Sequence, residues 1–113
     1  MKYLKSSLFA ALMVLTSNVF AQDKTDSVKV YGNCGMCQKR IEKAAKVDGV
    51  IKASWNVDSK VMAVTYDQSK TNLDKIEKSV TAVGHDTQKY SAENAVYDKL
   101  PGCCQYDRKA RNE

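Results

Sequence analysis

The chain has 113 residues, of which 18 are Lys or Arg and 13 are Asp or Glu, and its formal net charge is +5. This length suits one small domain. Because the basic residues are interspersed with acidic ones, the composition does not favour a nucleic-acid-binding protein.

The first 21 residues are typical of a secretory signal peptide. Lys2 and Lys5 form a charged start, Leu8 to Leu15 an apolar run, and Val19 to Ala21 a small-residue cleavage site. We therefore predict a mature protein that begins near Gln22, with about 92 residues and a charge near +3. The apolar run is shorter than the about 20 residues that span a bilayer. We expect a soluble periplasmic protein with no membrane insertion after cleavage.

The first mature element is a β-like stretch from Val28 to Tyr31, and it leads into Cys34-Gly35-Met36-Cys37. A helical pattern starts near Gln38 and ends at Asp48-Gly49. Exposed N–H groups at the start of a helix lower the pKa of nearby thiols and favour the thiolate that binds metal. The two cysteines therefore form a candidate site for one soft metal ion, although thiol redox enzymes use the same spacing at such a junction.

Other residues weigh against the alternatives for this cysteine pair. A redox enzyme of the thioredoxin type needs a proline facing the active cysteine, and Pro101, far along the chain, is the one proline in the sequence. A haem attachment site needs His after the second cysteine, where Gln38 stands. Two thiolates suit Cu(I) or Hg(II), whereas structural Zn(II) takes four ligands.

Two strands are expected next. Ile51, Ala53, Trp55 and Val57 alternate with polar residues, which predicts a strand buried on one face. Residues 58–60 predict a tight turn, and Val61 to Tyr66 a second strand that pairs with the first as a hairpin. The expected core includes the following side chains: Trp55, Val57, Leu73 and Ile76.

A second helix should begin at a capping box formed by Thr71 and Asp74 and end at Gly84. A weak pattern from His85 to Tyr90 predicts a last short strand. The resulting β-α-β-β-α-β order is that of an α/β (α+β) ferredoxin-like fold, an antiparallel sheet with two helices on one face.

The chain changes character after Tyr90. Residues 91–99 predict a short helix that Pro101-Gly102 breaks, and the adjacent pair Cys103-Cys104 follows. Cα atoms of neighbouring residues are about 3.8 Å apart, below the usual disulfide range, so these two cysteines are poorly placed to bridge each other. We interpret residues 91–113 as an appended C-terminal tail.

Residues 27–90 resemble the heavy-metal-associated domain family, which includes copper chaperones and periplasmic mercuric-ion-binding proteins. The resemblance rests on Cys34-Gly35-Met36-Cys37, on Val47-Asp48-Gly49-Val50, on the hairpin end Val64-Thr65-Tyr66-Asp67 and on Gly84. The chain departs from the family where Tyr31-Gly32-Asn33 replaces the usual Gly-Met-Thr. The resemblance implies a heavy-metal-associated domain over residues 22–90, with Cys34 and Cys37 as metal ligands.

Further ligands are candidates around this pair. Cys103 and Cys104 could fold back as third and fourth thiolates, which favours Zn(II) or a bridged copper cluster, or they could form a tail disulfide or a metal relay. In the resembling fold His85 lies in a loop beside the metal loop, where it could ligate or remain hydrogen-bonded to backbone. Met36 is expected to pack inward or to contact a partner rather than to bind the ion.

The sequence thus predicts a periplasmic metallochaperone, not an enzyme, that carries Cu(I) on Cys34 and Cys37, with Hg(II) and Zn(II) as alternative ions. By the resemblance, it passes the ion to a metal transporter or another thiol-bearing domain, and a metal-bridged homodimer is a further arrangement to test. One alternative is a mercuric-ion scavenger. A second, of another class, is a thiol-disulfide exchange protein that uses both cysteine pairs.

Overall fold

The computed structural model describes residues 22–108, so the predicted signal peptide lies outside the described residues. The elements follow in this order: β1 (Asp23–Lys29), α1 (Gly35–Ala45), β2 (Val50–Trp55), β3 (Val61–Asp67), α2 (Leu73–Thr81), α3 (Asn94–Tyr97) and the 3₁₀-helix η2 (Gly102–Cys104). Among the helices of this part of the chain, none has the length and apolar character needed to cross a membrane.

The three strands form one antiparallel sheet in the order β1-β3-β2. The predicted last strand is reduced to a single antiparallel bridge between Val30 and Thr87 beside β1. Around that bridge the Tyr31 N–H donates to the Asp86 carbonyl at 2.9 Å, and the Gln88 N–H donates to the Lys29 carbonyl at 2.9 Å. The predicted fold class is confirmed, with a fourth strand that is only a few residues of paired backbone.

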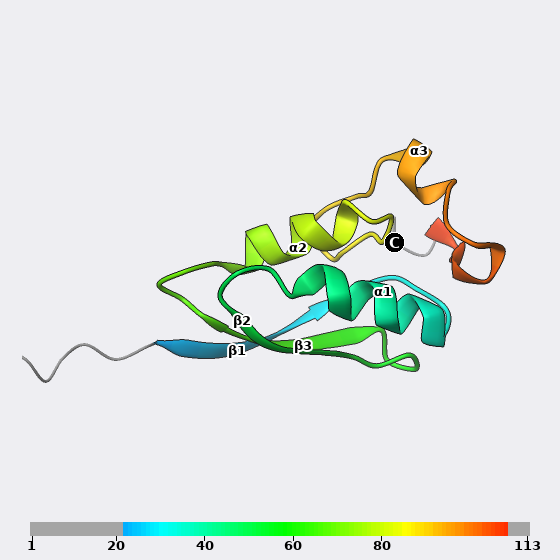
Figure 1. Cartoon of the computed structure of the whole chain (residues 1–113). Coiled ribbons are helices and arrows are strands. Elements are labelled where there is room, and N and C mark those ends of the chain that lie inside the picture. Colours follow the sequence, from blue (N-terminus) through cyan, green and yellow to red (C-terminus); the bar gives the residue numbers. More distant parts are fainter. Residues whose placement is uncertain (1–21, 109–113) are drawn as a thin grey trace, which may run out of the picture.

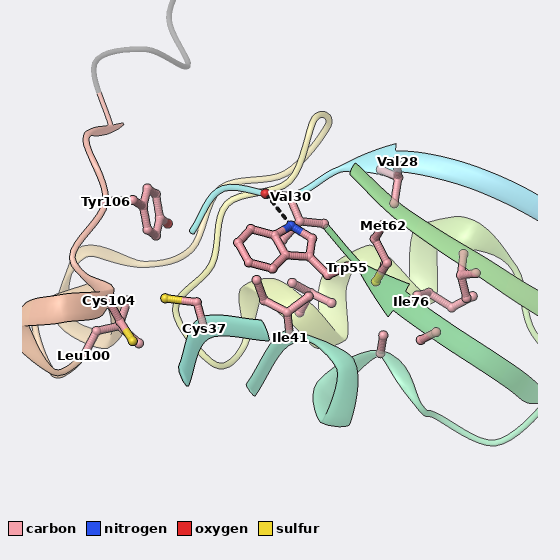
Figure 2. Packing of buried hydrophobic residues seen from close by; sticks show 14 of the residues in the cluster. Val28, Val30, Cys37, Ile41, Trp55, Met62, Ile76, Leu100, Cys104 and Tyr106 are labelled. Atoms are coloured by element: carbon pink, nitrogen blue, oxygen red, sulfur yellow. Dashed lines mark hydrogen bonds between the residues drawn. The ribbon is translucent and has the colours of Figure 1, made fainter. Parts of the chain in front are cut away.

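Helices α1 and α2 lie side by side on one face of the sheet (Figure 1). Between them and the sheet lie Ile41, Met62 and Ile76, which are fully buried. Trp55 is also buried, and its indole Nε1–H donates to the Val30 carbonyl at 2.9 Å, so the largest core side chain has its polar atom satisfied (Figure 2). This bond ties the end of β2 to the chain that leads into the Cys34 loop.

Both helix starts differ from the prediction. Helix α1 begins three residues early, at Gly35, because Cys34 has the extended backbone of an N-cap residue. Helix α2 begins at Leu73, and the cap is Asn72, whose Oδ1 accepts a hydrogen bond from the Lys75 N–H at 2.9 Å. The capping box predicted from Thr71 was therefore wrong by one residue, since Asn is at least as good a cap as Thr.

The predicted core is correct for Trp55 and Ile76 and wrong for Val57, while Leu73 is half-buried and packs against the core from its edge. The side chain of Val57 is 37% exposed, because β2 ends at Trp55 and the chain turns before reaching it. The turn is held by Asn56, whose Oδ1 accepts from the N–H groups of Asp58 and Ser59. The prediction failed because it extended the alternating pattern to Val57, two residues past the end of the strand.

The C-terminal segment packs onto the domain instead of extending from it. The 3₁₀-helix η2 contacts α1, and α3 lies further from it, above η2 in the view of Figure 1. Leu100, Cys104 and Tyr106 are 7%, 0% and 3% exposed and belong to the same buried cluster as Trp55 and Ile41. The core of the described chain therefore includes residues from the tail.

Candidate metal site

The loop before α1 is held close to the core by Gly32. A Cβ at this position would lie 3.1 Å from Cys37 Cβ, 3.2 Å from Ile41 Cδ1 and 3.2 Å from Trp55 Cη2. Such contacts are tighter than well-packed side chains tolerate, so the absence of a side chain lets the loop rest directly on the helix. The position of Cys37 is thus fixed by packing.

Cys34 and Cys37 lie at the first turn of α1 with their Sγ atoms 3.6 Å apart. Both are free thiols, Cys34 half-buried and Cys37 buried. The backbone N–H of Cys37, which lies in the first turn, is the main cause that lowers the pKa of Cys34 to about 7. Burial raises the pKa of Cys37 to about 11, although the Asn33 N–H donates to its Sγ at 3.4 Å.

A third sulfur comes from the tail. The Sγ atom of Cys104 lies 3.8 Å from that of Cys34, and the Sγ atoms of Cys34, Cys37 and Cys104 all lie within 4.8 Å of one another. Figure 2 shows Cys104 on the tail facing the end of α1 that carries Cys37. Burial raises the pKa of Cys104, while the guanidinium of Arg40, whose Nη1 donates to Cys104 Sγ at 3.2 Å, opposes that effect.

The tail is fastened at two points near these thiols. The Tyr106 hydroxyl donates to the Gly84 carbonyl at 2.9 Å and accepts from the Asp86 N–H at 2.7 Å. Arg108 forms a two-pronged ion pair with the buried carboxylate of Asp86, with both N···O distances 2.9 Å, and also donates to the Ala92 carbonyl at 2.7 Å. Bidentate pairs of this kind fix orientation as well as adding energy.

Cys103 does not join the group of three thiols. Its side chain is exposed, and its Sγ lies 3.6 Å from the Sδ of Met36 and 3.8 Å from the Sγ of Cys104. Met36 is 52% exposed, so it does not pack inward. The adjacent cysteines therefore differ: Cys104 faces the first pair, and the exposed Cys103 lies against Met36.

His85 is buried and is not part of the thiol group either. Its Nδ1 lies 2.8 Å from the Tyr31 carbonyl, and its ring stacks on Tyr106 with centroids 5.6 Å apart. A carbonyl partner identifies Nδ1 as the protonated nitrogen, and Nε2 has no hydrogen-bond partner within residues 22–108. Burial holds the pKa of His85 below its ordinary value, which keeps the ring neutral.

Sequence reasoning missed Arg40 and the fastening of the tail. In the sequence, Arg40 is one of several cations on a charged helix face. Its contact is with Cys104, which lies 64 positions further along the chain. Asp86 and Arg108 carry no motif. The sequence offered one signal for this ion pair: Asp86 stands beside Thr87, in the segment that approaches β1. A charged side chain buried at such a place needs a partner of opposite charge.

The domain has known relatives. The family model of the heavy-metal-associated domain matches residues 33–86. The mercuric transport protein periplasmic component of Acinetobacter calcoaceticus is 36% identical over 87 residues, which cover 75% of this chain and 93% of that protein. The chain belongs to the heavy-metal-associated domain family. It is accordingly a metal-binding protein, and the resemblance seen in its motifs is confirmed.

Solved structures agree with this assignment. The oxidized MerP from Ralstonia metallidurans CH34 is 29% identical with a TM-score of 0.55, and the match covers 58% of this chain and 94% of that one. A protein described as CopZ metallochaperone is 29% identical with a TM-score of 0.55, covering 57% of this chain and 98% of that one. The family match ends at residue 86, so the heavy-metal-associated domain pattern accounts for Cys34 and Cys37 but not for Cys104.

Proposed function

We propose that the chain is an exported carrier of a soft metal ion, which binds the ion on the thiolates of Cys34 and Cys37 and passes it to a membrane transporter. The observation that carries the proposal is the 3.6 Å separation of the two Sγ atoms at the start of α1, where a backbone N–H favours the thiolate of Cys34. Soft thiolate ligands select soft ions. The role is that of a binding protein, not an enzyme.

Hg(II) is the cargo that the relatives favour first. The match to a mercuric transport protein covers 93% of that protein, and its name places it in the periplasm, in keeping with the export signal predicted here. Cu(I), which the sequence alone favoured first, becomes the second candidate, supported by the similarity to a CopZ metallochaperone. Zn(II) is less favoured, because the described residues bring together three thiols and structural zinc takes four ligands.

The half-buried Cys34 leaves one side of the site accessible, which suits transfer by ligand exchange. Cys34 is half-buried and Cys37 is buried, so an incoming thiolate from a partner can reach an ion at the Cys34 side while Cys37 still holds it. Each exchange replaces one metal–sulfur bond by another without a change of oxidation state. A shallow hollow lined by Met36, Lys39, Arg40 and Lys43 adjoins the site and offers a basic surface to an acidic partner domain.

A thiol-disulfide exchange role competes with this proposal because the four free thiols form a continuous row in space. Neighbouring Sγ atoms in this row are 3.6–3.8 Å apart, in the order Cys37, Cys34, Cys104 and Cys103. Two properties separate the functions. An exchange protein has a disulfide potential in the catalytic range and reduces a test disulfide, whereas a carrier does neither at a useful rate.

The experiment is an anaerobic competition titration of the reduced mature chain with Hg(II), Cu(I) and Zn(II), each against a small-thiol competitor. We expect one ion per chain, with Hg(II) and Cu(I) bound far more tightly than Zn(II). The Cys34→Ser/Cys37→Ser variant should lose this binding, and Cys103→Ser, which changes an exposed cysteine outside the group, is the control. Full affinity in the double variant would rule the proposal out.

A further inference from the structure

We propose that Cys104 is a third metal ligand, so that the tail completes a three-thiolate site with Cys34 and Cys37. This inference rests on the proposed function and concerns the same ion. It differs from a two-cysteine carrier in one respect: the ion is held by the C-terminal segment as well as by the loop before α1.

The spacing of the sulfur atoms favours three ligands over two. With the zinc–sulfur bond of about 2.3 Å as a guide, two thiolates on opposite sides of an ion lie about 4.6 Å apart, and three around it in a plane lie about 4.0 Å apart. The separations are 3.6 Å for Cys34 to Cys37 and 3.8 Å for Cys34 to Cys104. The Sγ atoms of Cys37 and Cys104 lie within 4.8 Å of each other. Three-coordinate binding therefore moves Cys34 and Cys37 apart by about 0.4 Å, whereas two-coordinate binding must drive them apart by about 1 Å.

The described residues do not bring four thiols together around one point. The fourth thiol, Cys103, lies outside the group whose sulfur atoms are within 4.8 Å of one another, and its Sγ faces Met36. An ion that accepts three soft ligands is therefore the best match, and Hg(II) and Cu(I) both do so, unlike structural Zn(II).

The tail is held in place without the metal. Cys104 is fully buried between the Tyr106 anchor and the start of α1, and Arg108 pairs with the buried Asp86 two residues beyond Tyr106. Ordering a free tail at the moment of binding would cost conformational entropy for every residue fixed. Because the anchors already order it, that cost falls on folding and the third thiolate is preorganised.

Charge favours a divalent ion. Binding of Hg(II) by three thiols releases their three protons to water and leaves a cluster of net charge −1. Cu(I) would leave −2. The guanidinium of Arg40 contacts Cys104 Sγ at 3.2 Å, and Lys39 and Lys43 line the adjoining hollow. The contacting cation alone matches a net charge of −1, whereas a net charge of −2 depends on the more distant lysines, so the partly buried surroundings penalise the copper form more.

The test combines X-ray absorption spectroscopy with competition titration on the reduced mature chain loaded with one equivalent of Hg(II), and separately of Cu(I). The wild-type protein should show three sulfur neighbours per ion. Cys104→Ser should show two and lose at least about tenfold in affinity for Hg(II). Cys103→Ser is the matched control, since it changes the adjacent residue but removes a sulfur outside the group, and it should keep three neighbours and the wild-type affinity.

Circular dichroism of each variant separates loss of a ligand from loss of the fold, and Cys104→Ala repeats the test without a hydroxyl in the buried site. Two sulfur neighbours in the wild-type protein would overturn the inference, and so would loss of the third neighbour in Cys103→Ser instead of Cys104→Ser. In both cases the proposed function stands if Cys34→Ser/Cys37→Ser abolishes binding. Unchanged affinity in that double variant overturns the proposed function itself.

Discussion

The ion pair between Arg108 and Asp86 should contribute measurably to the stability of the described domain. Arg108→Gln removes both bonds to a carboxylate that is 1% exposed. Removing one partner of a fully buried pair costs about 3–5 kcal/mol. The Arg108 side chain is 24% exposed and Asp86 keeps a hydrogen bond from the Ala92 N–H, so we expect a loss of about 2–3 kcal/mol in the free energy of unfolding.

The assay is urea unfolding of the reduced, metal-free chain at pH 7. Lys89→Gln is the matched control, because it breaks the ion pair with Asp74, in which the side chains are 63% and 51% exposed. Exposed pairs contribute about 0–1 kcal/mol. Adding Asp86→Asn to Arg108→Gln should restore part of the loss by removing the stranded charge. The reasoning is refuted if Arg108→Gln and Lys89→Gln shift the unfolding midpoint equally.

Three further predictions concern the site and its surroundings. Gly32→Ala should lower the free energy of unfolding by about 1–3 kcal/mol, because the new Cβ would lie 3.1 Å from Cys37 Cβ. Gly35→Ala is the control and should leave stability unchanged, since a Cβ there has nothing within 4 Å. Equal midpoints for the two variants in thermal unfolding would contradict this. Limited alkylation of the metal-free chain at pH 7, followed by mass spectrometry, should modify Cys34 before Cys37. The reason is that the pKa of Cys34 is about 7 and that of Cys37 is about 11, and the thiolate is the form that reacts. Modification of Cys37 first would contradict this order of pKa values. Burial lowers the pKa of His85, so the unfolded chain binds its proton first, and the free energy of unfolding should fall as the pH drops below about 6.5. His85→Gln should flatten that dependence in urea titrations at several pH values, and an unchanged slope would show that other groups cause it.

The parts of the fold that the sequence predicts well are those with strong periodicity. The hairpin follows from the alternation around Trp55 in β2 and from the β-branched and aromatic residues of β3, and both helices follow from their apolar spacing. The alternation fails at Ile51, which is 57% exposed, because the β2 register shifts between Val50 and Lys52. Element ends were less accurate, because a cap or a turn decides them and several neighbouring residues can serve. The last strand shows the limit: Val30 and Thr87 pair, but the pattern near Thr87 is too short to say how far pairing extends.

The residues of the site also differ in how well the sequence predicts them. Cys34 and Cys37 could be singled out because a local spacing and a local junction carry the signal. Cys104 could be suspected and no more, because its place depends on contacts at a sequence separation of 70 from Cys34. The difference between Cys103 and Cys104 was beyond sequence reasoning, since it depends on which way η2 turns each side chain.

The buried tail also explains how the domain tolerates an unusual core. Three thiols lie at one end of the domain, and two of them, Cys37 and Cys104, are fully buried in the core cluster. The rings of Tyr31, His85 and Tyr97 surround Tyr106 in the same region, with centroids 5.0–6.4 Å from it. Aromatic contacts of this kind supply large buried area with specific geometry. The tail therefore stabilises the end of the domain at which the metal site lies, and the same residues that stabilise it position the sulfur of Cys104.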